Sequence, residues 1–125
     1  MFRLDLKPIA LEAWPKGPSR ALGWLKGKRV AALSGLGRPG RFEAALRDLG
    51  AQVSPWRFPD HHRFRLEELR HPPTGAAVIV STFKDRARLP AAWAPALPVY
   101  ALRVEAQVTP GPAFQRLLGQ ALRRA

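Results

Sequence analysis

The fold is decided by one short apolar run, Gly75-Ala76-Ala77-Val78-Ile79-Val80-Ser81, which begins at a glycine and ends at a polar residue. Its length is typical of a strand, and its continuous hydrophobicity indicates a strand that is covered on both faces. A second run of this kind lies at Lys28–Ser34 and stops at Gly35. Two such strands predict a mostly parallel sheet between two layers of covering segments.

Helix patterns alternate with strand patterns along the rest of the chain. A helix is expected to open at Pro39 and to stop at Gly50, with apolar residues at i, i+3, i+4 and i+7 on one face, namely Phe42, Ala45, Leu46 and Leu49. The other expected elements are a strand at 51–58, a short helix at 65–70 with Leu66 and Leu69 inside, a helical turn at 84–89, a strand at 98–104 and a closing helix at 112–124. This order predicts an α/β domain, a Rossmann-like three-layer arrangement.

The N-terminal segment has a different pattern. Phe2–Trp14 alternates apolar and polar residues around Pro8, which favours two short edge strands. Trp14–Lys28 is a connector in which Ala21–Leu25 supplies a short apolar plug. We therefore expect a single domain in which residues 1–27 form a β extension and connector and residues 28–125 form the α/β core.

The composition limits the chemistry. The chain has 125 residues, 46% of them hydrophobic, which suits one domain with a buried core. It has no cysteine, so disulfides and thiolate chemistry are excluded, and a zinc site would have to use three histidines and nine carboxylates. No apolar run approaches the roughly 18 residues that span a bilayer. The expectation is a cytoplasmic protein without a transmembrane segment.

The formal charge of +12 points to an anionic partner, such as nucleic acid, a phosphorylated small molecule or an anionic membrane face. An alternative is compositional bias, because most of the basic residues are arginine in a chain rich in Ala, Gly and Pro. The four tryptophans are spread along the chain rather than interleaved with a basic stripe. Nucleic acid binding through base stacking is therefore not favoured.

In open α/β sheets, ligands bind beyond the carboxyl ends of the strands. The loops that follow the expected strands are 35–41, 59–65 and 82–88, and they carry many more basic than acidic residues. The candidate anion-binding residues on these loops are Arg38, Arg41, His62, Arg63, Lys84, Arg86 and Arg88. The hydroxyl of Thr82 has two possible roles, a contact with phosphate oxygens or an N-cap for the turn that follows.

Two local motifs lie on these loops. Gly35–Gly40 matches G-x-G-x-x-G, with Asp60 twenty residues beyond it, which is the spacing of a dinucleotide-binding loop; the alternative is a tight turn, since Pro39 removes one backbone donor. The group Asp60-His61-His62 suits a metal site, an acid/base pair or a structural turn. Adjacent histidines point apart on an extended backbone, which disfavours one metal held by both. No metal site is predicted.

The machinery for holding ATP and magnesium is not found in the sequence. It has no G-x-x-x-x-G-K-[ST] loop, no G-x-S-x-G elbow and no aspartate pair after an apolar strand. A self-sufficient dehydrogenase or hydrolase is accordingly the least favoured of the functions considered.

Several motifs follow one another along the chain, namely Gly27–Val30, Ser-Gly-Leu-Gly-Arg-Pro-Gly-Arg-Phe at 34–42, Leu46–Gly50, Phe-Pro-Asp-His-His at 58–62, Ser-Thr-Phe-Lys-Asp at 81–85 and Arg88-Leu89. This succession resembles the C-terminal half of tetraacyldisaccharide 4'-kinase, the lipid A kinase. Phe2-Arg3-Leu4 is similar to the segment that links the two halves of that family. The resemblance implies that Gly35, Gly37 and Pro39, with Arg41 and Phe42, form a structural turn that opens a helix, and that Gly40 completes the dinucleotide pattern by accident.

The resemblance also implies a role for Asp60 and His61 as an accessory pair. In the family, the histidine of the D-H pair faces the kinase site and supports the aspartate base that deprotonates the sugar hydroxyl. This chain has Phe83 where the family usually has Glu, and the half with the P-loop, the magnesium ligands and the aspartate base is missing from it. Without that half, phosphoryl transfer is not expected, so ATP and Mg²⁺ would come only through a P-loop partner.

Three functions therefore stay open. The first is a kinase-derived domain, not catalytic alone, that docks on a partner or binds an anionic ligand, and a homodimer is one form of such docking. The second is an independent basic module for nucleic acid or a phosphorylated metabolite. The third is a subunit of a split lipid A 4'-kinase.

Overall fold

The computed structural model describes residues 2–110, and the closing helix expected at 112–124 lies outside this range. Within the described residues, five strands form one sheet in the order β1-β5-β4-β2-β3. The strands are β1 (Phe2–Ala13), β2 (Arg29–Ser34), β3 (Gln52–Arg57), β4 (Val78–Thr82) and β5 (Val99–Pro110). All neighbouring pairs are parallel except β1 and β5, which are antiparallel. The prediction of an α/β fold with a mostly parallel sheet is confirmed.

The helical segments are shorter than a Rossmann-like pattern suggests. Over residues 2–110 the one α-helix is α1 (Gly40–Asp48), and the other helical segments are the 3-10 turns η1 (Leu22–Leu25), η2 (Glu68–Arg70) and η3 (Asp85–Arg88). The helix expected at 65–70 is thus the single turn η2. Leu69 is buried as predicted, but Leu66 is 38% exposed, because it precedes this turn and helical spacing does not apply to it.

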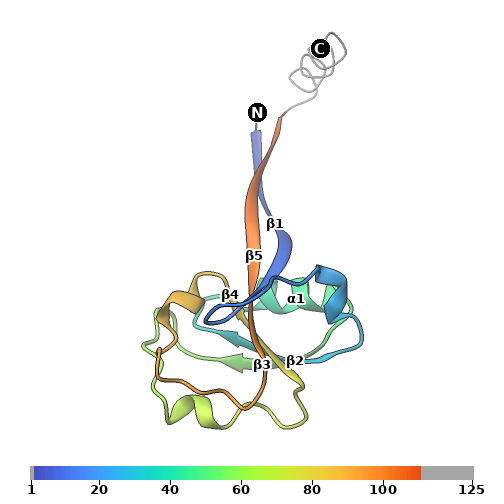
Figure 1. The fold of residues 1–125 in the computed structure, drawn as a ribbon. Helices are drawn as coiled ribbons and strands as arrows, with labels where there is room; N and C mark the ends of the chain where they lie inside the picture. The colour runs from blue at the N-terminus through green and yellow to red at the C-terminus, as the bar shows by residue number, and fades with distance from the viewer. Residues whose placement is uncertain (1, 111–125) are drawn as a thin grey trace.

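The N-terminal strand differs from its prediction. β1 is one strand of 12 residues rather than two short ones, and its pairing with β5 shifts register between Pro8 and Ala10. Proline has no N–H to donate, so the ladder is irregular there without being broken. β5 is longer than expected. Beyond Leu102 it pairs with β1 alone, and Figure 1 shows the two strands continuing as a ribbon away from the other strands.

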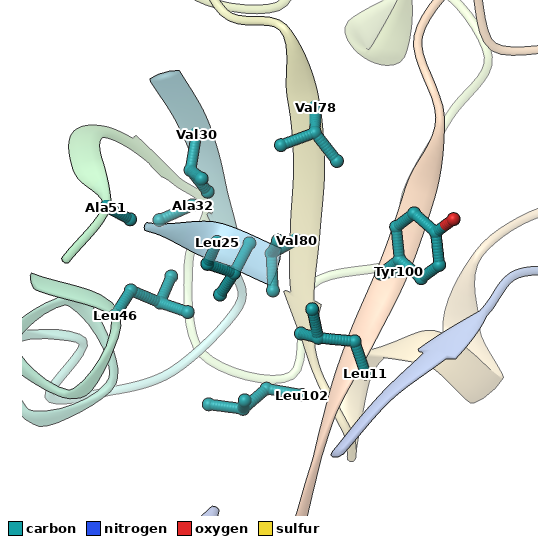
Figure 2. Packing of buried hydrophobic residues seen from close by; sticks show 10 residues of the cluster. All are labelled: Leu11, Leu25, Val30, Ala32, Leu46, Ala51, Val78, Val80, Tyr100 and Leu102. Carbon is teal, nitrogen blue, oxygen red and sulfur yellow. The ribbon is translucent and has the colours of Figure 1, made fainter. Parts of the chain in front are cut away.

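Both faces of the sheet are covered by apolar clusters. On one face, β2 contributes Val30 and Ala32 to a cluster that also contains Leu25 of η1 and Leu46 of α1, which Figure 2 shows pointing toward one another. On the other face, Ala31 and Leu33 pack with residues from the loops, among them Phe64, Leu69 and Trp93. Leu25 is fully buried, so the predicted apolar plug is confirmed. Burial on both faces is the reason that β2 and β4 have no polar alternation.

Because β2, β3 and β4 are parallel, their carboxyl ends lie at one edge of the sheet. The three loops that leave this edge begin at Gly35, Phe58 and Phe83. They are the loops that the sequence places at the functional edge, and their contacts with one another define the candidate site.

Candidate functional site

The first loop is held by its glycines. The backbone N–H of Gly35 donates to Oδ2 of Asp85 at 2.8 Å, and Gly35 is itself buried. A Cβ at Gly35 would lie 3.3 Å from both Asp85 Oδ1 and the carbonyl oxygen of Pro59, and a Cβ at Gly37 would lie 3.3 Å from Asp60 Oδ2. At Gly40 a Cβ would meet nothing within 4 Å. The first two glycines therefore allow the loops after β3 and β4 to close onto this one.

These contacts bear on the dinucleotide interpretation. In a dinucleotide-binding loop the glycines bring backbone amides close to a pyrophosphate. Here the Gly35 amide is already bonded to Asp85, Pro39 has no amide hydrogen, and Gly40 has no close neighbour that requires glycine. The geometry favours a structural turn formed by Gly35, Gly37 and Pro39, after which α1 begins at Gly40.

The second loop projects Asp60 and His61 outward. His61 has a φ of 57°, a left-handed conformation that is uncommon for residues other than glycine, and its N–H donates to the carbonyl of Gly35 at 3.2 Å. The side chains of Asp60 and His61 are 53% and 66% exposed, and His61 Nε2 lies 3.8 Å from Asp60 Oδ2. The pair is therefore accessible to a group that stands opposite this edge.

His62 has different partners. Its ring stacks on Phe58 with centroids 5.2 Å apart and meets the edge of Phe64, and its Nε2 lies 2.5 Å from Glu68 Oε2. The two histidines thus diverge, as the sequence predicts. One ring nitrogen of His62, Nε2, is thus held by a carboxylate. Among the side chains that the structure describes, no group of three His, Asp or Glu is placed to hold a metal ion.

The third loop contains the buried carboxylate of the site, Asp85. This residue has no exposed side-chain surface, and its Oδ2 accepts hydrogen bonds from Thr82 Oγ1 at 2.6 Å and from the Gly35 amide. Thr82 Oγ1 in turn accepts from the Asp85 amide at 3.0 Å. Of the two roles considered for Thr82, the cap of the following turn is the one that the geometry favours.

Arg88 connects the third loop to the second. Its Nη1 lies 3.5 Å from Asp85 Oδ1, and its Nη2 lies 2.9 Å from His61 Nδ1. One guanidinium thus contacts both the buried carboxylate and the exposed imidazole. The sequence identifies Arg88 as a candidate cation for an anion, and it places Asp85 and Arg88 in motifs of the family resemblance, but it indicates neither the burial of Asp85 nor its contact with Arg88. The spacing Thr-x-x-Asp directly after the most apolar strand is the signal that would have found the buried turn.

The comparison with known proteins agrees with the motif order on these loops. The sequence model of the family described as Tetraacyldisaccharide-1-P 4'-kinase, LpxK, matches residues 1–123. The chain belongs to the LpxK family. The tetraacyldisaccharide 4'-kinase of Anaeromyxobacter sp. (strain Fw109-5) is 41% identical over 128 aligned positions, which cover 85% of this chain and 34% of that protein. That of Syntrophus aciditrophicus (strain SB) is 33% identical over 94% of this chain and 33% of its own length.

A solved LpxK structure has the same fold. The crystal structure of LpxK from Aquifex aeolicus, described as an "apo" form in complex with ATP, superposes with a TM-score of 0.55 at 25% identity and covers 95% of this chain but 35% of that one. The chain thus spans about a third of the length of the LpxK proteins that it matches.

The other basic residues predicted for this LpxK-like edge are exposed. They are Arg38, Arg41, Arg63, Lys84 and Arg86. The guanidinium of Arg86 lies 3.8 Å from the centroid of the Phe83 ring. Exposed cations on all three loops at one edge leave the predicted anion-binding surface sterically accessible, and anion binding itself stays a prediction.

An ion pair that the sequence does not reveal lies next to the first loop, between α1 and the end of β3. The carboxyl of Glu43 in α1 is 1% exposed and accepts two hydrogen bonds from Arg57 at the end of β3, one of them at 2.8 Å. The hydrogen bonds from Arg57, more than its charge, hold the pKa of Glu43 below its ordinary value. The pair joins the N-terminal turn of α1 to the strand that precedes the Asp60-His61 loop.

Two hollows lie outside this group of contacts. One, of about 280 Å³, is lined by Ile79 and residues from 66–72 and 92–97. The other, of about 290 Å³, lies between residues 12–19, Arg86 and Ala101. In the described residues no helix has the length and hydrophobicity needed to cross a bilayer.

Proposed function

We propose that this chain supplies the Asp60 and His61 side of a tetraacyldisaccharide 4'-kinase site and docks on a P-loop half that holds the nucleotide. The observation that carries the proposal is the exposed His61 imidazole, which is held by Arg88 at 2.9 Å and anchored through it to buried Asp85. An imidazole that is held at Nδ1 and is otherwise exposed suits a site that is completed by another segment. The family membership of residues 1–123 supports the same assignment.

The proposal includes no catalysis by these 125 residues alone. Phosphoryl transfer depends on positioned phosphates, a metal ion and an oriented nucleophile, acting together. The sequence contains no P-loop motif, and the described loops present cations and one exposed acid-imidazole pair. ATP and Mg²⁺ would therefore be held by the P-loop half, on another chain or another segment.

The exposed cations add a second contribution. Arg38, Arg63, Lys84 and Arg86 lie on the three loops at the edge that carries His61, and Arg41 lies in the first turn of α1, directly after the first loop. The name of the family describes a substrate that carries a 1-phosphate, and a nucleotide adds further phosphates. Cations gathered at the edge of a site raise the local concentration of such anions and stabilise them there.

Reconstitution tests the proposal. This chain is mixed with the part of the Anaeromyxobacter sp. (strain Fw109-5) kinase that it does not match, and ATP-dependent phosphorylation of tetraacyldisaccharide 1-phosphate is measured. We expect no turnover by either part alone, turnover by the mixture, and loss of at least tenfold with His61→Asn. The matched control is His71→Asn, an exposed histidine away from the three loops, which should keep the activity. Turnover by this chain alone, or a mixture that neither associates nor turns over, would refute the proposal.

The charge of +12 favours a second candidate, an independent basic module that binds nucleic acid or a phosphorylated metabolite. Its signature is an affinity that falls steeply with salt in the absence of any partner. Tight, salt-dependent binding of a single-stranded oligonucleotide by the chain alone, together with failure of the reconstitution, would favour this candidate. A second copy of the chain in place of the P-loop half would appear as a dimer in the measured solution mass.

A further inference from the structure

We propose that Arg88 is a positioning residue that holds the His61 imidazole with its proton on Nε2, and that buried Asp85 holds Arg88 for this task. The catalytic consequence rests on the proposed function, whereas the assignment of the proton concerns this chain alone. Two contacts carry the inference, that of Arg88 with Asp85 and that of Arg88 with His61, and they join the three residues in one chain of groups.

The first step is the direction of the hydrogen bond between Arg88 and His61. A guanidinium has donors and no acceptor, and it is not deprotonated in proteins. The nitrogen that lies 2.9 Å from Arg88 Nη2 is Nδ1 of His61, which must therefore accept through its lone pair. In a neutral imidazole the proton is then on the other nitrogen, Nε2.

Second, the other ring nitrogen of His61, Nε2, faces away from Arg88 and has no close partner on Asp60. The His61 side chain is 66% exposed, and its Nε2 lies 3.8 Å from Asp60 Oδ2, beyond hydrogen-bond distance. Nε2–H is thus a donor without a close acceptor on Asp60. It can donate to a carboxylate or phosphate oxygen of a group opposite the edge. The other tautomer would place an N–H against the Arg88 donor, which the geometry disfavours.

The third step is the support of Arg88 itself. Its side chain is 26% exposed, and the Asp85 carboxylate beside its Nη1 has no exposed surface. Asp85 Oδ2 is held by Thr82 Oγ1 and the Gly35 amide, which leaves Oδ1 toward Arg88. A buried carboxylate fixed by two donors sets the position of the guanidinium that it faces.

The chemistry of the side chain explains why arginine stands at this position. Arg88 contacts Asp85 through one terminal nitrogen and His61 through the other, 27 residues earlier in the chain. A guanidinium is a rigid fork that serves two partners at once, whereas lysine places a single nitrogen on a flexible stem. Arg88→Lys is therefore expected to lose the hold on His61 although it keeps the charge.

The backbone of His61 is also held in place. His61 is held in the left-handed conformation, with its N–H on the carbonyl of Gly35, and the amide of the same glycine is bonded to Asp85. Both the backbone and the ring of His61 are thus tied, through Gly35 and Arg88, to one buried carboxylate. The site presents a donor of defined direction rather than a freely rotating imidazole.

Nitrogen NMR of the ¹⁵N-labelled chain at about pH 8.5, where imidazoles are neutral, tests the assignment. Long-range proton–nitrogen spectra should show His61 with an unprotonated Nδ1 and a protonated Nε2. The nitrogen shifts of Nδ1 and Nε2 should be more widely separated in His61 than in exposed His71. His71 serves in the same spectrum as the reference for an imidazole whose two tautomers are averaged. In Arg88→Met and Arg88→Lys the separation should narrow toward that of His71, whereas Arg47→Met, an exposed arginine on α1, should leave it unchanged.

A protonated Nδ1 in the wild-type chain, or a separation that is the same in the wild type and in Arg88→Met, would overturn the proposal. The wild-type spectrum decides the tautomer even where a variant does not fold. In the reconstituted kinase, Arg88→Met should lower kcat at least tenfold with little change in the KM for ATP, and Arg88→Lys should not restore it. Failure of the reconstitution with an intact His61 signature would count against the proposed function and leave the role of Arg88 standing.

Discussion

The amide of Gly35 donates to the buried Oδ2 of Asp85 at 2.8 Å, which ties the turn after β2 to the turn after β4 across 50 residues. Asp85 accepts a second hydrogen bond from Thr82 and faces Arg88. Its carboxylate thus joins the loops after β2 and β4, and through Arg88 it is also linked to His61 in the loop after β3.

Replacing Asp85 should therefore destabilise the fold. Asp85→Ala leaves the buried Gly35 amide and Thr82 hydroxyl without their acceptor, and each such loss costs about 1–3 kcal/mol. We expect a clearly lower urea midpoint with an unchanged m-value. Asp48→Asn, at the end of α1 and exposed, is the matched control and should change stability by no more than about 0.5 kcal/mol. Equal midpoints for the two variants would contradict the role given to Asp85.

The glycines of the first loop make a second prediction. Gly35→Ala places a methyl group 3.3 Å from a backbone carbonyl and from Asp85, so it should lower stability and weaken the hold on the loop. Gly40→Ala meets open space at the first residue of α1, and alanine is favoured over glycine in a helix by up to about 1 kcal/mol. Thermal melts of both variants test this. A more damaging Gly40→Ala would revive the dinucleotide interpretation.

The Glu43–Arg57 pair predicts how stability depends on pH. The pKa of Glu43 is lowered in the folded chain, so its contribution is fully present above the ordinary value of 4.5 and is lost as the pH falls through the folded value. Glu43→Gln should therefore melt at a lower temperature than the wild type at pH 7, and the difference should shrink toward pH 3. Exposed Glu67→Gln is the control and should show no such convergence. A constant difference between pH 7 and pH 3 would assign the effect to packing instead.

The exposed cations predict the response to salt. Arg63→Ala with Lys84→Ala removes two charges from the loops at the carboxyl edge, and Arg47→Ala with Arg70→Ala removes two exposed charges elsewhere. Binding of a nucleoside triphosphate to the reconstituted kinase, measured by calorimetry at two salt concentrations, should weaken several-fold for the first pair alone and should become less sensitive to salt. Equal weakening by both pairs would indicate an effect of net charge.

Much of the sheet could be predicted because β2 and β4 are apolar on both faces. This pattern is typical of strands that are covered on both sides in a three-layer fold. Parallel pairing then places their following loops at one edge without further information. The ribbon of β1 and β5 could not be predicted, since the length of β5 past Leu102 depends on pairing with residues about 100 positions away. Local propensity does not contain that information.

The contacts within the site were less predictable than its location. The Asp60-His61 pair is conspicuous because its residues are polar and follow a strand. Asp85 is also charged and in a loop, so its sequence suggests exposure, whereas the structure buries it against Gly35, Thr82 and Arg88. Arg88 contacts Asp85 and His61, whereas the neighbouring cations are exposed, and this difference likewise follows from tertiary contacts alone.

Variants of the adjacent residues His61 and His62 should separate effects on stability from effects on kinase activity. His62 stacks on Phe58 and is paired with Glu68, so His62→Ala should cost about 1–2 kcal/mol of stability, the range of an aromatic pair together with a lost hydrogen bond. His61 is exposed, and asparagine tolerates its left-handed backbone, so His61→Asn should change stability little while lowering turnover of the reconstituted kinase at least tenfold. Urea unfolding and the kinase assay on both variants check this. His62→Ala should retain turnover at temperatures where it is folded, so a loss of activity there, or a fully active His61→Asn enzyme, would reverse the roles assigned to the two side chains.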